Sequence, residues 1–185
     1  LAVDRRAAEP MSTNNDVPDV TIRPWRIEDF DAVKAILDDT FAGTWLPELT
    51  PEAARAYEES GAPVGYIDEK GPDFFVAEID GEVVGMVHWE HDFVHALHVP
   101  AMHQRKGIAR ALMAFAEDGM RADGVELARL ETDTFNTKSQ GFYLALGYRE
   151  ADRYPDLEWH SGFTTILYVK TLSPRTATPS QRKHA

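Results

Sequence analysis

A short basic stretch between residues 104 and 110 combines residue types that bind phosphate. Two arginines and one lysine surround Gly107, and the stretch joins an extended run at residues 94–99 to a predicted helix. The first N–H groups of a helix have no partner within the helix and lie at the positive end of its dipole. A strand that leads through a basic, glycine-containing turn into a helix therefore indicates an anion-binding site.

A second concentration of reactive side chains consists of five of the seven histidines, which fall within residues 88–103: His88, His91, His95, His98 and His103. Imidazole titrates near neutral pH, so a histidine here could accept a proton from an amine. The same cluster could instead bind a metal ion. Alternation along a regular strand sends His95 and His98 to opposite faces, however, and no His-x-x-x-His pair lies on a predicted helix. We therefore predict no metal ligands, and a histidine-cluster metal-binding protein is the weaker alternative.

The composition indicates an acidic globular protein without cysteine. The chain has 185 residues, a net charge of −12 and no cysteine. An acidic surface disfavours nucleic acid, and it suits either a cationic partner or simple solvation. The lack of cysteine excludes disulfides and thiolate chemistry. No apolar run approaches the ~20 residues that span a bilayer, and no signal segment is apparent at the start, so we expect a cytoplasmic protein without membrane contacts.

The chain is expected to form one domain between two flexible tails. Residues 1–19 mix charges with asparagine, serine and proline, and such a segment cannot bury enough apolar surface to offset the entropy of ordering. Residues 173–185 combine serine, threonine and proline with basic side chains. The folded domain is therefore predicted at residues 20–172.

Hydrophobic periodicity predicts a mixed order of strands and helices. Asp80 and Gly81 between two β-rich runs predict a tight hairpin, because both central residues of a type I′ turn need positive φ. The strands are predicted at 20–25, 74–79, 82–89, 93–99, 126–132, 148–154 and 162–169, and the helices after residue 29 and at 50–60, 108–122 and 137–146. This order predicts an α/β fold with a mixed, mostly antiparallel sheet and helices on both faces.

Two segments together resemble the signature regions of the GNAT acetyltransferase superfamily. The first is the basic loop, whose Gln/Arg-x-x-Gly-x-Gly/Ala pattern is matched by Gln104, Gly107 and Ala109. The second comes later in the chain, where the pattern Asn-x-x-Ala-x-x-x-Tyr-x-x-x-Gly-Phe is matched by Asn136, Tyr143, Gly147 and Tyr148. The resemblance extends over residues 20–172 in the order of the elements, and it implies a single GNAT-like domain.

Two residues depart from the family pattern. Arg105 stands where a glycine is frequent, so the loop backbone must make its turn with a Cβ present. Ser139 replaces the usual alanine, which is a mild change.

The resemblance implies acetyl-CoA as the donor and an amine as the acceptor, with direct transfer in a ternary complex. It also implies that backbone N–H groups of the loop hold the pyrophosphate, and that the strand before the loop pairs with the pantetheine arm. The predicted cofactor-binding residues are Leu97, Val99, Gln104, Arg105, Lys106, Gly107, Ile108, Ala109, Arg110, Asn136 and Tyr143.

Acetyl transfer requires that the acceptor ammonium lose a proton and that the departing thiolate be protonated or stabilised. Tyr143 matches the family's tyrosine and is the predicted acid near the thioester sulfur. His95 matches a histidine on this strand in the serotonin N-acetyltransferase branch, and it is the predicted base or relay. In a regular strand His95 would share the face of Leu97 and Val99.

Two further base candidates follow from the expected hairpin. If residues 91–92 form the turn, His88 pairs directly across from His95, and Glu90 lies diagonal to it. Glu90 and His88 are therefore the second and third candidates for the base.

Acidic and aromatic side chains in segments that flank the acceptor site of GNAT folds favour a small cationic amine. These side chains are Trp45, Tyr66, Asp152, Tyr154, Asp156, Glu158 and Trp159. A peptide amine is the other acceptor class, and homodimer formation is left open. The alternative function is a non-catalytic acyl-CoA-binding sensor or interaction domain.

Overall fold

The structure is a computed structural model that describes residues 19–156 and 162–173. Its strands are β1 (Thr21–Pro24), β2 (Phe75–Ile79), β3 (Glu82–Glu90), β4 (Phe93–His98), β5 (Leu127–Asp133), β6 (Arg149–Pro155) and β7 (Thr164–Thr171). Its helices are α1 (Phe30–Thr44), α2 (Pro51–Ser60), α3 (Ala62–Lys70), α4 (Ile108–Ala122) and α5 (Thr137–Ala145), with short 3-10 helices η1 (Ile27–Asp29), η2 (Leu46–Glu48), η3 (Gly71–Asp73) and η4 (Ala101–His103). The two predicted tails lie almost entirely outside the described residues.

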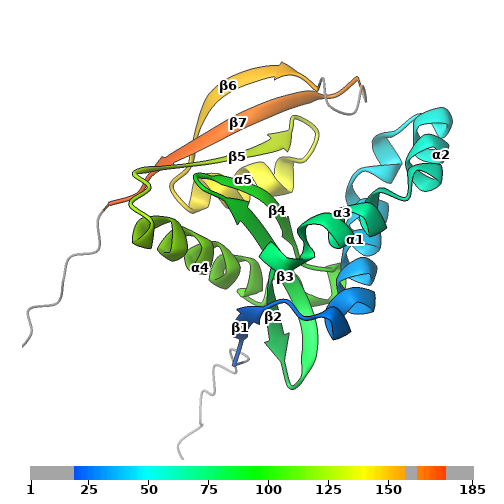
Figure 1. The fold of residues 1–185 in the computed structure, drawn as a ribbon. Helices are drawn as coiled ribbons and strands as arrows, with labels where there is room; N and C mark the ends of the chain where they lie inside the picture. Colours follow the sequence, from blue (N-terminus) through cyan, green and yellow to red (C-terminus); the bar gives the residue numbers. More distant parts are fainter. Residues whose placement is uncertain (1–18, 157–161, 174–185) are drawn as a thin grey trace, which may run out of the picture.

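The strands of the described chain form one sheet in the order β1-β2-β3-β4-β5-β7-β6 (Figure 1). Every neighbouring pair is antiparallel except β4 and β5, which run parallel. Parallel neighbours need a crossover connection, and α4 supplies it between β4 and β5. The predicted mixed, mostly antiparallel sheet is confirmed.

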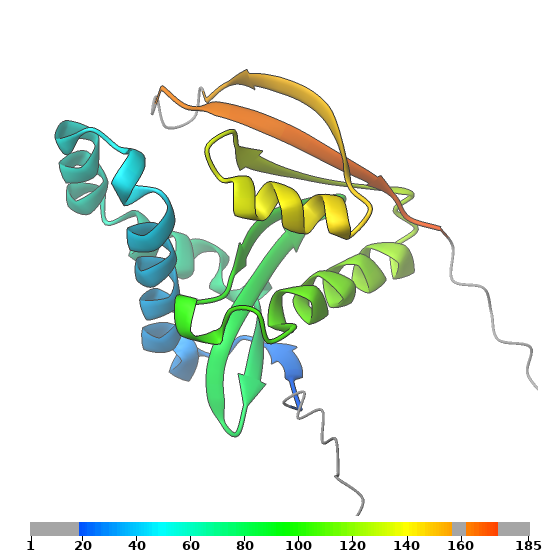
Figure 2. The same cartoon turned by 180° about the vertical axis from the view of Figure 1, so that it is seen from behind.

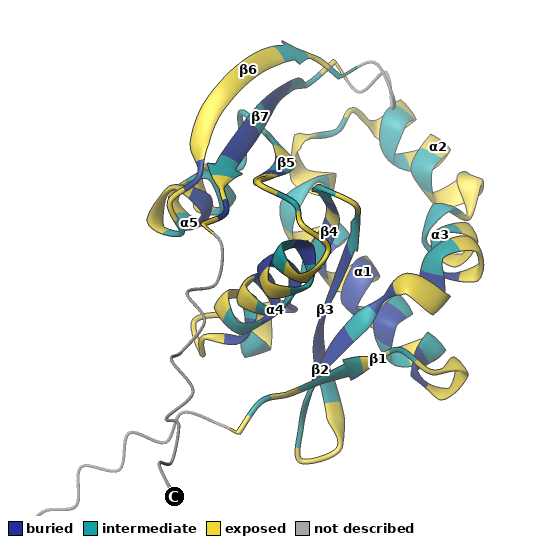
Figure 3. Ribbon diagram, turned by 60° about the vertical axis from the view of Figure 1, so that its left-hand side comes forward, coloured by how far each residue is buried: buried dark blue, intermediate teal, exposed yellow. Residues whose placement is uncertain are grey.

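Helices cover both faces of the sheet through two hydrophobic cores. On one face, α1 and α3 pack against the sheet through a core that includes Val33, Ile67 and Met86. On the other face, the larger core includes Leu112 of α4 and Tyr143 of α5. Figure 2 shows α4 and α5 in front of the sheet, and Figure 3 shows buried residues on α1, α4 and the central strands.

Local sequence signals place the turns and helix ends where they were expected. Asp80 and Gly81 have φ of 51° and 83°, as a type I′ hairpin requires. The Thr50 side chain accepts a hydrogen bond of 3.2 Å from the Ala53 N–H and so caps α2. Gly147 follows α5 with a φ of 89°, a conformation that glycine adopts without strain.

The sequence pattern does not predict α3, and this is a correction to the expected order of elements. Gly61, with a φ of 64°, ends α2, and α3 begins at once with Pro63 in its first turn. Gly65 inside the helix and Pro63 near its start both lower the helix propensity of the segment. Tertiary packing stabilises α3 despite this low propensity, because Ile67 is fully buried in the core with residues of α1.

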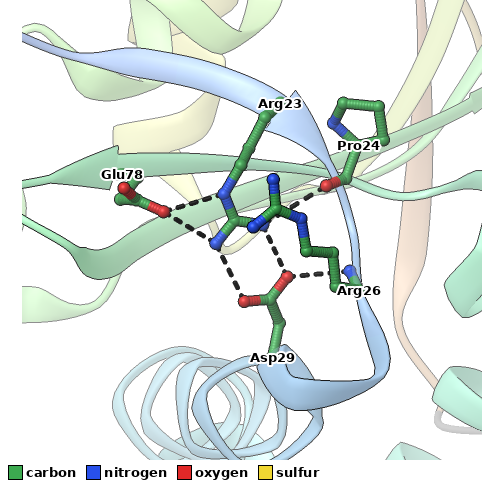
Figure 4. A network of polar contacts seen from close by, with 5 residues as sticks. All are labelled: Arg23, Pro24, Arg26, Asp29 and Glu78. Carbon is green, nitrogen blue, oxygen red and sulfur yellow. Dashed lines mark hydrogen bonds and ion pairs between the residues drawn. The ribbon is translucent and has the colours of Figure 1, made fainter.

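A partly buried ion-pair network holds the start of α1 against the sheet (Figure 4). The Arg23 guanidinium on β1 lies 2.7 Å from Asp29 Oδ2 and also donates to Glu78 on β2 at 2.7 Å. Asp29 Oδ2 further accepts the Arg26 backbone N–H at 2.8 Å. These charge-assisted bonds to Arg23, together with the backbone bond, hold the pKa of Asp29 below its usual range.

A β-bulge at His95 overturns the expected pairing of the histidines. His88 pairs with Ala96 and Trp89 pairs with Val94, so His95 is the extra residue of β4. The His95 ring stacks on the His88 ring at 5.2 Å, on the face covered by α1 and α3. The prediction that His95 shares the face of Leu97 was wrong, because it assumed a regular strand.

The bulge also corrects the argument that His95 and His98 point to opposite faces. The His98 ring lies on the α1 side, with Nδ1 2.8 Å from Thr40 Oγ1 of α1. Both histidines therefore face the same layer, since one inserted residue shifts the alternation of β4 by one position.

Candidate active site

The sheet opens between β4 and β5 directly beside the bulge. The parallel ladder between these strands contains only the pairs Phe93 with Arg129 and Val94 with Leu130. The Asp92 carbonyl accepts a hydrogen bond of 2.7 Å from the Arg129 N–H, so the main-chain carbonyl of Asp92 faces β5. Alternation, shifted by the bulge, then directs the main-chain groups of Leu97 toward the opening.

The same rule directs the main chain of Val99 toward the opening, although β4 ends one residue earlier, at His98. The Val99 carbonyl accepts a hydrogen bond of 3.0 Å from Gln104 Nε2. Gln104 thereby ties the beginning of the basic loop to the end of the strand. The Gln104 side chain therefore stabilises the loop. Because the Val99 carbonyl is already hydrogen-bonded to Gln104, the Val99 N–H is the main-chain group that can pair with a ligand.

The basic loop delivers an uncapped helix start to this end of the sheet. Gly107 precedes α4 with a φ of 86°, and no side chain caps the helix. The first hydrogen bond within the helix joins the Ala111 N–H to the Gly107 carbonyl at 3.0 Å. The N–H groups just before Ala111 therefore point out of the helix end, where an anion would bind.

Arg105 takes the turn expected of it despite its Cβ. Its φ is 66°, in the left-handed region that glycine usually occupies. Arg105, Lys106 and Arg110 are exposed, whereas Ile108 is only 1% exposed and belongs to the core. The predicted contribution of Ile108 to cofactor binding is thus limited to its backbone N–H.

Two residues of the second motif lie at the start of α5 and within it. Asn136 Oδ1 accepts the Ser139 N–H at 3.2 Å and caps α5, so only its amide NH₂ remains to donate to a ligand. Tyr143 is 8% exposed within the core that α4 and α5 cover. Burial raises the pKa of Tyr143 to about 12, so its phenol keeps its proton at neutral pH.

A tryptophan joins the two halves of the sheet across the opening on the α1 side. Trp45, at the end of α1, donates its Nε1–H to Asp133 Oδ2 at the end of β5, at 2.9 Å. The Trp45 ring lies 6.2 Å from the ring of His98 on β4. Residues far apart in sequence therefore meet here. The sequence analysis named His98 only as a member of the histidine cluster, and it did not single out Asp133 or Thr40.

Thr40 links His98 to α1. The Thr40 hydroxyl oxygen lies 2.9 Å from the Ile36 carbonyl oxygen and 2.8 Å from His98 Nδ1. Burial lowers the pKa of His98 to about 4, which keeps the ring neutral at neutral pH.

Carboxylates concentrate on the β5 side of this region. Burial raises the pKa of Asp133, and the nearby charges of Asp156 and Glu131 raise it further. The Tyr154 hydroxyl donates to Glu131 from the neighbouring hairpin of β6 and β7. Among the acceptor-side residues expected from the sequence, Trp45, Tyr154 and Asp156 thus lie at or beside this acidic group.

The remaining expected acceptor-side residues lie elsewhere. Tyr66 is directed into the α3 core, where its hydroxyl is 2.7 Å from His88 Nδ1. Asp152 is exposed on β6 and bonds the adjacent backbone N–H. Glu158 and Trp159 lie outside the described residues.

The three base candidates differ in how they are held. His95 is exposed at the bulge, directly after the last residue of β4 that pairs with β5. His88 is 1% exposed. Glu90 forms an ion pair with Lys70, whose Nζ lies 2.8 Å from Glu90 Oε1. That pairing with Lys70 lowers the pKa of Glu90 and so makes it a weaker base.

Comparisons with known proteins relate this chain to acetyltransferases. Residues 30–148 match the model of the acetyltransferase (GNAT) family. Blasticidin-S acetyltransferase of Streptomyces morookaense is 34% identical over 95 residues, which make up 51% of this chain and 68% of that protein. N-acetyltransferase 8 of Homo sapiens is 30% identical over 95 residues, which make up 46% of this chain and 42% of that protein.

Solved structures share the fold at low sequence identity. The PaiA N-acetyltransferase from Thermoplasma acidophilum, in complex with coenzyme A, has a TM-score of 0.67 at 17% identity and covers 82% of this chain and 98% of its own. The ribosomal-protein-S18-alanine N-acetyltransferase from Escherichia coli has a TM-score of 0.61 at 19% identity and covers 90% and 99%.

The fold and the opened sheet thus define a GNAT-type acetyltransferase domain. The chain belongs to the acetyltransferase (GNAT) family. Members of this family use acetyl-CoA. Within the described residues, no helix combines the length and the apolar character needed to cross a bilayer.

Proposed function

We propose that this protein is an N-acetyltransferase that uses acetyl-CoA and transfers the acetyl group directly to a small cationic primary amine. The observation that carries the proposal is the place where β4 parts from β5 after two residue pairs. That opening lies beside the uncapped start of α4. The main chain of β4 can therefore pair with an extended chain, and the N–H groups at the start of α4 can bind an anion. Acetyl-CoA has both features in one molecule.

The donor side fits coenzyme A through main-chain groups. The N–H groups at the start of α4 hold the pyrophosphate, and Arg105, Lys106 and Arg110 add positive charge. The main chain of Leu97 and the N–H of Val99 pair with the pantetheine arm as an added strand would. The Asn136 amide NH₂ donates to the same arm, because its oxygen is engaged in capping α5.

The transfer step needs one proton acceptor and one proton donor. His95 takes a proton from the acceptor ammonium, either directly or through water, because it stands at the bulge where the opening begins. The amine lone pair then forms a bond to the thioester carbonyl carbon, and the C–S bond breaks as the electron pair returns to sulfur. The Tyr143 phenol donates its proton to that sulfur, and its raised pKa keeps the donor protonated. The positively charged nitrogen of the new amide then loses its second proton to the Tyr143 phenolate, which restores the phenol.

The acceptor side fits a cation. Asp133, Glu131 and Asp156 place negative charge at the end of β5, and Trp45 adds an aromatic wall. A positively charged amine is attracted by both features. The relative from Streptomyces morookaense is named for blasticidin S, which supports a small-molecule acceptor for this chain as well.

A thiol-release assay separates this function from its alternative. Purified protein is mixed with acetyl-CoA and a panel of amines that covers small polyamines, amino acids, aminoglycoside-like amines and peptides. We expect release of the coenzyme A thiol with at least one small cationic amine. Tight acetyl-CoA binding without release across the whole panel would instead favour the non-catalytic acyl-CoA-binding sensor.

A further inference from the structure

Three side chains of types that bind metal ions converge where η3 meets the end of β3. Asp73 comes from η3, and His88 and Glu90 come from β3. One ligand atom from each of the three lies within 4.8 Å of the others. This set differs from the histidine cluster considered from the sequence, because only one of its members is a histidine.

His88 is the group that points to a ligand. Its side chain is 1% exposed, and its Nε2 atom has no hydrogen-bonding partner among the described residues. Nε2 lies 3.5 Å from Glu90 Oε1, which is too far for a good hydrogen bond but close enough for both atoms to share one ion. A buried polar atom of this kind is normally paired, so its position calls for a partner.

The surroundings of His88 hold the ring in a coordinating orientation. Its Nδ1 atom lies 2.7 Å from the Tyr66 hydroxyl, and the rings of Phe74 and His95 each lie 5.2 Å from the ring of His88. Metal-bound histidines are commonly oriented by a hydrogen bond at the other ring nitrogen.

Lys70 provides the competing cation at this place. Its ammonium lies 2.8 Å from Glu90 Oε1 and 3.7 Å from Glu69. An incoming ion must displace this ammonium from Glu90. The carboxylates of Asp73 and Glu90 together carry two negative charges, whereas Lys70 supplies only one positive charge. The site therefore still attracts a doubly charged cation.

We propose that His88, Glu90 and Asp73 form a binding site for a divalent first-row transition-metal ion, for which Zn²⁺ is the probe. One imidazole nitrogen and two carboxylate oxygens are a ligand set that Zn²⁺ accepts, with a fourth position for water. The ion joins η3 to β3 and so fastens the end of α3 to the sheet.

Calorimetric titration of the full chain with Zn²⁺ tests the site. We expect binding to the wild type, and Asp73→Asn and Glu90→Gln each weaken it by at least about tenfold. Glu69→Gln is the matched control: it removes one carboxylate near Lys70 without removing a ligand, so its dissociation constant stays within about twofold of the wild type. Lys70→Gln removes the competing cation and tightens binding.

A measurement on the unsubstituted protein guards against folding defects in the variants. In histidine-ring NMR spectra, Zn²⁺ should shift the His88 signals in proportion to occupancy. The proposal is overturned if the His88 signals do not move, if Glu69→Gln weakens binding as much as Asp73→Asn does, or if Lys70→Gln does not tighten it.

Discussion

The proposed donor side and acceptor side of the opening between β4 and β5 use different kinds of groups, main-chain atoms on one side and side chains on the other. On the proposed donor side, the binding groups are mainly main-chain atoms of β4 and of the start of α4, set by Gly107 and the uncapped helix. On the acceptor side, they are side chains from three elements, with Trp45 bonded to Asp133 across the opening. A main-chain site depends on backbone geometry, whereas a side-chain site depends on residue identity. Changing a side chain on the donor side should therefore weaken ligand binding less than changing a side chain on the acceptor side.

Tyr143 is the proposed proton donor to sulfur, and loss of its hydroxyl should have the largest effect. Tyr143→Phe keeps the buried ring and removes only the hydrogen donated to sulfur, so we expect kcat to fall about 100-fold, within the usual range for a general acid. Acetyl-CoA affinity, measured by calorimetry, should not change. Tyr168→Phe, a second buried tyrosine with its ring 6.3 Å from that of Tyr143, is the control and should retain kcat. Unchanged turnover of Tyr143→Phe in a chemistry-limited assay would remove its assigned role.

Asp133 should separate the two sides most clearly. Asp133→Asn removes the half-buried charge proposed to attract a cationic amine, and we expect the KM for that amine to rise about 10- to 100-fold, as for loss of a charge-assisted hydrogen bond. The dissociation constant of acetyl-CoA should stay the same. Asp152→Asn, on the exposed face of β6, should alter neither quantity. Equal weakening of donor and acceptor binding by Asp133→Asn would contradict the division into two sides.

The Arg23 and Asp29 pair supports the acceptor side from a distance, since α1 leads from Asp29 to Trp45. Asp29→Asn should lower the free energy of unfolding by about 2 kcal/mol near pH 7, the scale of hydrogen bonds to charged groups. The folded-state pKa of Asp29 is lowered, so its stabilisation is present above the unfolded pKa and is lost as the pH falls through the folded value. Denaturant unfolding of both proteins between pH 7 and pH 2 should therefore show the difference shrinking below about pH 4.

The smallest effect is expected from the backbone of the loop. Gly107→Ala places a Cβ at a φ of 86°, which costs about 1 kcal/mol, and acetyl-CoA binding should weaken several-fold. Gly141→Ala is the control, because Gly141 is exposed inside α5 with open space around it, and alanine there should raise the melting temperature. If both variants behave alike, positive φ at Gly107 does not matter for the donor side.

The same division explains what could be predicted from the sequence. The donor side follows from local signals, because a glycine, a helix start and a strand lie next to one another in the chain. The Asp80-Gly81 hairpin was predictable from φ preferences, whereas the left-handed turn at Arg105 was expected only because the family pattern has a glycine at that position.

The acceptor side could not be predicted in this way. Trp45 and Asp133 are 88 positions apart, and only the fold brings them together. The bulge at His95 shifted the alternation of β4, and no residue type in the strand marks where an extra residue enters the ladder. A polar residue at the end of β5, just before the Asn136 motif, was the one local signal that could have identified Asp133.

Amide hydrogen exchange in the presence of acetyl-CoA tests the central claim most directly. We predict that saturating acetyl-CoA slows exchange at Leu97, Val99 and the N–H groups of residues 107–110, with little change at Trp45. Binding without protection of these amides, or no binding at millimolar acetyl-CoA, would contradict a donor site built from the edge of β4 and the start of α4.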